Sequence, residues 1–291
     1  MLGITFIGSG SKGNSALLEF NKSYYLLDAG ISCKRITDYL CTRNLCLSDI
    51  AGIFITHEHE DHTKGLKVLL KKAPNLKIYC TAGTALAINQ RGTEIKDFHR
   101  IDYETPFMIN GCKCTAFQVS HDAIQPMGLH VETNNQTMVM ATDLGCVTSD
   151  VLRHAQNADI LCIESNYDLE LLKRSSYPTF LKQRIRSKTG HLPNEGVRGI
   201  LSRMNKIPQN LVLMHLSQES NTKEKALESL YSFFECSDGC RFKNIHITVA
   251  AQDEPSERVI INEEEILPAA LKAKLLDTTA SVNKDLEVIA R

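Results

Sequence analysis

Short runs of apolar residues, separated by turn residues, recur along the first half of the chain and predict strands. Asn134-Asn135 lies between two such runs and predicts a hairpin turn. From about residue 148 onward, segments with apolar residues at helical spacing alternate with short apolar runs, so helices alternate with strands. We therefore expect two sheets with helices packed outside. The predicted strands are 2–7, 15–20, 24–28, 50–55, 77–80, 112–118, 127–133, 136–142, 159–163, 211–214 and 244–249, and the predicted helices are 32–44, 64–72, 83–90, 148–157, 194–204 and 222–234, with further helices within 168–187.

Length and composition suit one large α/β domain. The chain has 291 residues, and its 43% hydrophobic content can fill a sizeable core. We expect residues 1–262 to form this domain and residues 263–291 to form a C-terminal extension packed on it. The formal net charge is −1, so a polyanionic partner would need a local basic patch. No run approaches 18 apolar residues, which excludes a membrane-spanning helix.

The ten cysteines indicate a reduced protein, because no pair has the C-x-x-C spacing and several lie inside apolar runs. The first residues also lack the basic region and long apolar stretch of a secretory signal. We therefore expect a cytoplasmic protein whose cysteines form no disulfide framework. We interpret the closely spaced pairs Cys112/Cys114 and Cys236/Cys240 as ordinary thiols, with metal binding as the alternative.

The hexapeptide at residues 57–62, His-Glu-His-Glu-Asp-His, directly follows a predicted buried strand. Alternate side chains of an extended segment share a face, so His57 and His59 can converge on one metal ion. Asp61 and His62 would face a second position once the chain turns into the next helix. Imidazole and carboxylate are ligands that zinc prefers, and they also suit manganese or iron. The alternative is a chance group of histidines in an exposed turn, and we interpret the hexapeptide as a metal site.

Four further predicted strands end close to a histidine or an aspartate. These residues are Asp28, His121, Asp143 and His215. Loops at one edge of a sheet are where α/β folds collect functional groups. One such residue alone is often structural, but its recurrence at four strand ends favours a shared site. We expect Asp28 to orient a metal ligand, with simple turn formation as the alternative.

With these residues in place, the chain resembles the metallo-β-lactamase fold superfamily. More narrowly, it resembles the YycJ/WalJ-type branch of nucleases, which is similar to ribonuclease Z and ribonuclease J. The segments that carry this narrower resemblance are 9–15, 28–36, 120–123, 142–145, 164–166, 190–192 and 215–217. The resemblance implies a four-layer αβ/βα sandwich of two mixed sheets, with two divalent metal ions, zinc or manganese, in a cleft between them. It also implies that His57, His59 and His121 hold the first metal, that Asp61, His62 and His215 hold the second, and that Asp143 bridges the two.

The resemblance further implies a phosphodiesterase whose nucleophile is a hydroxide shared by the two metals and oriented by Asp61. His191, with Glu164 as its partner, is expected to protonate the leaving group. The chain departs from the expected pattern at two positions in the segment that should contact substrate. Tyr167 stands where we expect a histidine, and Pro193 stands where we expect a serine.

Six basic residues and no acidic ones lie between Lys173 and Asn194. Such a run is often only a solvated helix face, but this one leads to His191. We expect Lys182 and Arg186 to contact a polyanionic substrate. The Ser/Gly-rich loop at 9–15 could bind a terminal phosphate, through Ser9, Ser11 and Asn14.

Together these observations predict a DNA exonuclease that runs 5′ to 3′ and is linked to DNA repair, with DNA favoured over RNA as its partner. One alternative is a small-molecule hydrolase of thioesters, lactones or β-lactams on the same metal site. A second is a non-catalytic metal-binding or docking module, against which the complete ligand set argues.

Overall fold

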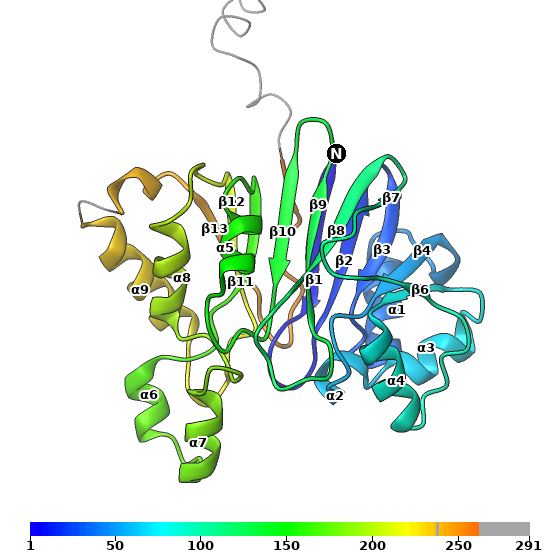
Figure 1. The fold of residues 1–291 in the computed structure, drawn as a ribbon, viewed down its shortest axis with the longest axis horizontal. Coiled ribbons are helices and arrows are strands. Elements are labelled where there is room, and N and C mark those ends of the chain that lie inside the picture. The colour runs from blue at the N-terminus through cyan, green and yellow to red at the C-terminus, as the bar shows by residue number, and fades with distance from the viewer. Residues whose placement is uncertain (237–238, 262–291) are drawn as a thin grey trace, which may run out of the picture. The chain divides into compact units, whose positions relative to one another are not determined.

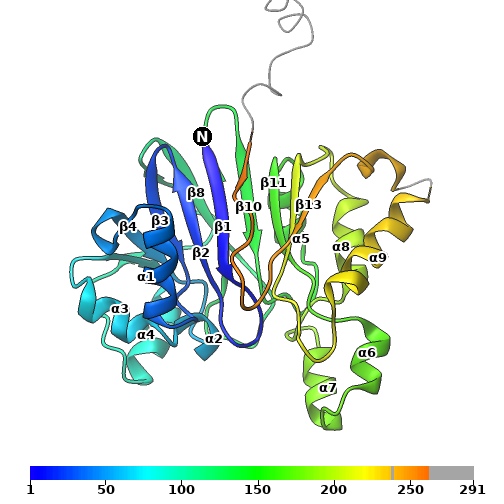
Figure 2. The ribbon, with the colours of Figure 1, turned by 180° about the vertical axis from the view of Figure 1, so that it is seen from behind.

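Two mixed sheets of seven strands each lie face to face in the computed structural model, which describes residues 1–236 and 239–261 (Figure 1). Helices cover the outer face of each sheet, as Figures 1 and 2 show from opposite sides. The predicted sandwich of two mixed sheets is therefore confirmed. The predicted extension at 263–291 lies outside the described residues. Among those residues, no helix combines the length and apolarity needed to cross a membrane.

The first sheet has the order β14-β1-β2-β3-β4-β5-β6. Its strands β14, β1, β2 and β3 are antiparallel, and β3 to β6 are parallel. The strands are β1 (Leu2–Gly8), β2 (Ser15–Phe20), β3 (Ser23–Leu27), β4 (Ile50–Phe54), β5 (Lys77–Cys80), β6 (His99–Arg100) and β14 (Val259–Ile260). The outer layer is formed by α1 (Cys33–Thr42), α3 (Leu66–Lys72) and α4 (Ala82–Gln90), with η1 (Leu47–Asp49) before β4 and α2 (Glu60–Thr63) before α3.

The second sheet has the order β13-β12-β11-β10-β9-β8-β7. Strands β7 to β10 are antiparallel, and β10 to β13 are parallel. The strands are β7 (Phe107–Ile109), β8 (Cys112–Gln118), β9 (Met127–Glu132), β10 (Thr137–Ala141), β11 (Ile160–Glu164), β12 (Asn210–Met214) and β13 (His246–Val249). The outer layer consists of α5 (Ser149–Ala155), α8 (Asn194–Leu201) and α9 (Lys223–Phe234), followed by η2 (Cys240–Phe242).

An aromatic cluster joins the two sheets. Tyr25, Phe54 and Tyr79 come from neighbouring strands of the first sheet, with ring centroids 5.0–6.4 Å apart. Tyr79 also stacks on Phe107 of the second sheet at 6.3 Å. Large aromatic rings bury much apolar area, so this cluster helps to hold the two sheets together.

The predicted elements differ from the observed ones mainly in the shortest strands, which the apolar runs do not reveal. Strands β6, β7 and β14 have only two or three residues each, and no alternation marks them. The helices expected within 168–187 are two short ones, α6 (Leu169–Arg174) and α7 (Thr179–Ile185). Pro178 separates them because the residue before a proline avoids the helical conformation.

A partly buried histidine pair lies between β9 and α5, away from the strand ends. His130 Nδ1 is 2.8 Å from His154 Nδ1, and His154 Nε2 is 3.1 Å from Glu104 Oε1. His154 therefore donates its Nε2–H to Glu104 and accepts the Nδ1–H of His130. In the described part of the chain, the buried Nε2 of His130 has no hydrogen-bond partner. Burial and the neighbouring His154 lower the pKa of His130 to about 4.

This pair makes stability sensitive to acid. The pKa of His130 is lower in the folded than in the unfolded chain, so the unfolded chain binds more protons between about pH 6.5 and pH 4. The free energy of unfolding should therefore fall by about 2 kcal/mol from this group between pH 8 and pH 5. Urea denaturation at both pH values should show that the free energy of unfolding falls less for His130→Asn than for the wild type. The side-chain amide of asparagine keeps a donor for His154. Equal losses in the two proteins would contradict this assignment.

Candidate metal centre

Loops from both sheets meet at one edge of the sandwich. The hexapeptide 57–62 follows β4, and His121 follows β8. Asp143 comes two residues after β10 ends, and His215 directly follows β12. In the second sheet, β8, β10 and β12 end at the same edge, because β8 and β10 run in the same direction and β10 to β12 are parallel. The hexapeptide after β4 of the first sheet meets their ends there. The strand ends thus gather side chains that are far apart in the sequence.

The first donor group consists of His57, His59 and His121, whose candidate ligand nitrogens lie within 4.8 Å of one another. His59 Nδ1 and His121 Nε2 are 3.1 Å apart. The Nε2 of His57 is buried and has no hydrogen-bond partner among the described residues. Burial and the adjacent histidines also hold the pKa of His57 well below its usual value. A neutral, buried and unpartnered imidazole nitrogen facing two others fits a metal ligand.

The second donor group consists of Asp61, His62, Asp143 and His215, again within 4.8 Å. Asp143 Oδ2 is 3.1 Å from His62 Nε2, and Asp143 Oδ1 is 3.6 Å from the Nε2 atoms of both His215 and His121. Burial alone would raise the pKa of Asp143, but the surrounding histidines hold it well below its usual range. A buried carboxylate between two groups of imidazoles suits a position that touches both metal sites. These His/Asp groups are suited to binding metal ions.

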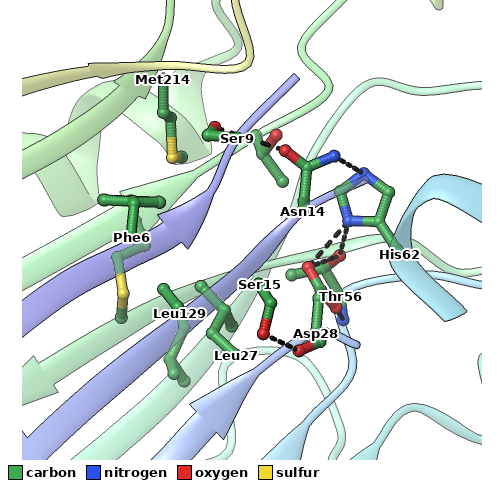
Figure 3. Close-up of a pocket in the computed structure, with 13 residues that line it drawn as sticks. Phe6, Ser9, Asn14, Ser15, Leu27, Asp28, Thr56, His62, Leu129 and Met214 are labelled. Carbon is green, nitrogen blue, oxygen red and sulfur yellow. Dashed lines mark hydrogen bonds and ion pairs between the residues drawn. The ribbon is translucent and has the colours of Figure 1, made fainter. Parts of the chain in front are cut away.

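Asp28 fixes the orientation of His62. Its Oδ2 lies 2.8 Å from His62 Nδ1, while Oδ1 accepts the backbone N–H of Thr56 at 2.8 Å. Figure 3 shows this contact beside the small cavity behind the donor groups. With Nδ1 held in this way, the Nε2 of His62 points toward Asp143.

Ser9 and Asn14, which the sequence assigns to substrate, are buried and hold the ligand loops. Ser9 Oγ accepts the backbone N–H of His215 at 2.8 Å and donates to Asn14 Oδ1 at 3.3 Å. Asn14 Nδ2 lies 3.1 Å from His62 Nε2, as Figure 3 shows. Ser11, from the same loop, lines the cleft in front of the donor groups.

Three residues of the centre have left-handed backbone. The φ angles are 59° at Asp28, 55° at Asp143 and 57° at His215. Residues other than glycine rarely adopt positive φ, although aspartate, asparagine and histidine do so more readily than most. Each residue comes at or just after the end of a strand, where the sharp turn directs its side chain into the centre.

Glu164 and His191 form a pair beside the second donor group. Glu164 is fully buried, and its Oε1 lies 2.7 Å from His191 Nδ1 and 3.1 Å from His215 Nδ1. The other oxygen accepts the backbone N–H groups of Leu144 and Leu192. Burial would lower the pKa of His191, but the Glu164 carboxylate outweighs it and raises that pKa. Because Nδ1 is engaged, Nε2 is the ring nitrogen left to act in the cleft, which His191 lines.

The cleft has a volume of about 220 Å³, and α7 forms part of its wall. Lys182 does not face it, since its ammonium group donates to the carbonyls of Lys173 and Ser175 at the end of α6, at 2.7 Å each. Arg186 is exposed and is not a lining residue. The lining residues are Ser11, His59, Asp61, His121, Asp143, Asn166, Tyr177, Leu181, Arg184, Ile185, His191, His215 and Ser217.

Arg184, Asn166 and Asp122 were given no individual role in the sequence analysis. Arg184, Tyr177 and Asn166 line the cleft, and Asp122 pairs with Arg184. Arg184 belongs to the basic run that the sequence shows, but only the packing of α7 decides which members face the cleft. Tyr167 and Pro193 are the two positions at which the chain differs from the expected pattern. Tyr167 is buried, and the two residues form a β-bridge with each other.

Comparison with known proteins agrees with this geometry. The family described as the beta-lactamase superfamily domain matches residues 24–216. The exodeoxyribonuclease WalJ of Streptococcus pneumoniae is 35% identical over 227 residues, which cover 76% of this chain and 84% of that protein. The exodeoxyribonuclease YycJ of Bacillus anthracis is 31% identical over 237 residues, which cover 80% and 89%.

A solved structure shares the fold. The metallo-beta-lactamase fold protein YhfI from Bacillus subtilis superposes with a TM-score of 0.65 at 14% identity, covering 87% of this chain and 98% of that one. The family match, the two relatives and the common fold agree with one another. The chain therefore belongs to the metallo-β-lactamase fold superfamily of metal-dependent hydrolases, in the branch that contains these WalJ and YycJ relatives.

Proposed function

We propose that the protein is a DNA exonuclease, a metal-dependent phosphodiesterase that degrades DNA from 5′ to 3′ and is linked to DNA repair. The observation that carries this proposal is the position of Asp143 between the two donor groups, with the Glu164–His191 pair at the same cleft. The names of the WalJ and YycJ relatives support DNA as the substrate. The direction of cleavage and the link to repair rest on the resemblance to that branch.

In this proposal, two divalent cations, zinc or manganese, are held by the two donor groups. His57, His59 and His121 would bind one, Asp61, His62 and His215 would bind the other, and Asp143 would contact both. When bound, such a pair supplies a nucleophilic water at neutral pH and neutralises charge on the phosphate oxygens.

The protein's own groups position the reactants. Asp61 lines the cleft and is partly exposed, so its carboxylate can orient the attacking water. His191 lines the same cleft, with Nδ1 held by Glu164, and its Nε2 would donate a proton to the leaving oxygen. The buried Glu164 keeps the imidazole in one orientation and favours its protonated form. A small-molecule hydrolase with an apolar pocket is disfavoured, because most residues that line this cleft carry polar or charged side chains.

Labelled oligonucleotides test the proposal. With manganese or zinc, the enzyme should release a 5′-terminal label at once as mononucleotide, while a 3′-terminal label should remain on progressively shorter fragments. Single-stranded DNA, duplex DNA and RNA of one sequence are compared, and His57→Ala, which lacks the unpartnered imidazole, should be inactive. No cleavage by the wild type, or equal cleavage by the variant, would refute the proposal. Early release of the 3′ label would refute the direction alone.

A further inference from the structure

The helices α6 and α7 form an arm, here residues 168–190, that projects beyond the edge of the sandwich where the donor groups lie (Figures 1 and 2). A small apolar cluster supports the arm, in which Leu172 and Ile185 pack with Tyr167, the residue just before the arm. It carries six basic side chains and two acidic ones. Both acidic side chains are engaged locally, since Asp168 caps α6 and Glu170 pairs with Lys173 at 2.6 Å. The arm therefore presents a positive surface beside a cleft of carboxylates and imidazoles.

Arg184 is the basic residue of the arm that lines the cleft. Its Nε lies 2.7 Å from Asp122 Oδ2, and in the described part of the chain no other carboxylate pairs with it. The other oxygen of Asp122 lies 3.5 Å from His121 Nε2. Asp122 thus holds the guanidinium group close to the first donor group. The two terminal nitrogens of the guanidinium group are left to bind an anion such as a phosphate.

Phe180 lies on the same face of α7 as Arg184, because the two are four residues apart in a helix. They are separated by about 6 Å along the helix axis. The side chain of Phe180 is 71% exposed, the largest exposure among the described large apolar residues. An exposed aromatic ring one helical turn from a cationic group can bind single-stranded nucleic acid, because a base stacks on the ring and a phosphate binds the cation.

We propose that this arm binds the single strand that enters the cleft. Arg184 binds a phosphate next to the scissile one, and Phe180 stacks on a base. The proposal rests on the proposed nuclease function.

Four variants test the arm by steady-state kinetics on a single-stranded oligonucleotide. Arg184→Gln should raise KM about tenfold with kcat within about threefold, and Phe180→Ala should raise KM by about tenfold. The slope of log(kcat/KM) against log salt should be shallower by about 0.7 for Arg184→Gln. The matched controls are Arg203→Gln, an exposed arginine outside both the arm and the cleft, and Tyr231→Ala, an exposed aromatic residue on α9. The KM of each control should stay within about twofold of the wild-type value.

Hydrolysis of bis(p-nitrophenyl) phosphate separates failure of the arm from failure of the nuclease function. This compound has only the scissile phosphate, so all four variants should hydrolyse it at about the wild-type rate. If the wild type cleaves both substrates but Arg184→Gln behaves like Arg203→Gln, or loses kcat alone, the arm proposal is wrong and the nuclease function stands. If the wild type cleaves neither substrate, the nuclease function itself is wrong.

The role of Asp122 in positioning Arg184 has its own test. Asp122→Asn should raise KM for the oligonucleotide in the wild-type background and should add little in the Arg184→Gln background, because the two residues act as one unit. Additive effects on KM would show that Asp122 acts independently of Arg184.

Discussion

Asp143→Asn is expected to lose most of the metal affinity of the protein and, with it, the hydrolytic activity. Asp143 contacts histidines of both donor groups, and asparagine keeps its shape and tolerates its left-handed backbone. The variant therefore removes charge and little else. Mutation of a residue that only orients a metal ligand lowers metal affinity by about 10–100-fold, so Asp143→Asn should lower it by at least about 100-fold.

Thermal and chemical unfolding with and without zinc measure this loss. At zinc about 1,000 times the wild-type Kd, binding should stabilise the wild type by about 4.1 kcal/mol and a 100-fold weaker variant by about 1.4 kcal/mol. Asp150→Asn is the matched control, since Asp150 lies in the first turn of α5, outside both donor groups, and pairs with Arg153 at 2.9 Å. Equal stabilisation of Asp143→Asn and the wild type by zinc would rule out Asp143 as a ligand.

His191→Ala is expected to lower kcat on DNA by about 10²–10⁴-fold, the usual contribution of a general acid. The loss should depend on the leaving group. The alkoxide that leaves a DNA strand needs a proton, whereas nitrophenolate is a weak base and leaves without one. Hydrolysis of bis(p-nitrophenyl) phosphate should therefore fall far less than DNA cleavage. A parallel loss on the two substrates would indicate that His191 supports the metal site and does not transfer a proton.

Glu164→Gln provides the companion variant for the same pair. Glutamine can still accept the backbone N–H groups of Leu144 and Leu192, while its amide nitrogen replaces the oxygen that contacts His191 and His215. It no longer favours the protonated imidazole of His191, so the loss of kcat should again be larger on DNA than on the nitrophenyl ester.

The candidate ligands could be predicted from the sequence because strand ends are visible in it. Each apolar run fixes where a buried strand stops, and parallel strands bring such ends to one edge. His121, Asp143 and His215 therefore meet the hexapeptide without any knowledge of the loops between them. The two sheets and their outer helices followed from the same pattern of runs.

The substrate side of the cleft could not be predicted in the same way. Within one basic run, Arg184 faces the cleft while the ammonium group of Lys182 caps the end of α6. Sequence spacing on a seven-residue helix does not say which face points inward. Ser9 and Asn14 illustrate the same difficulty, because a Ser/Gly-rich loop can cradle a ligand or, as here, hold neighbouring loops through buried hydrogen bonds.

The left-handed backbone at Asp28, Asp143 and His215 lowers the stability of the folded chain, but it positions three side chains of the centre. Glycine would relieve strain of about 1–3 kcal/mol at each position, and it would also remove the side chain that the centre needs. Selection for stability alone would thus favour glycine at these positions and remove the side chains of the centre. Stabilised forms of this enzyme should therefore gain their stability elsewhere, in the outer helices and surface loops, and keep these three strained turns.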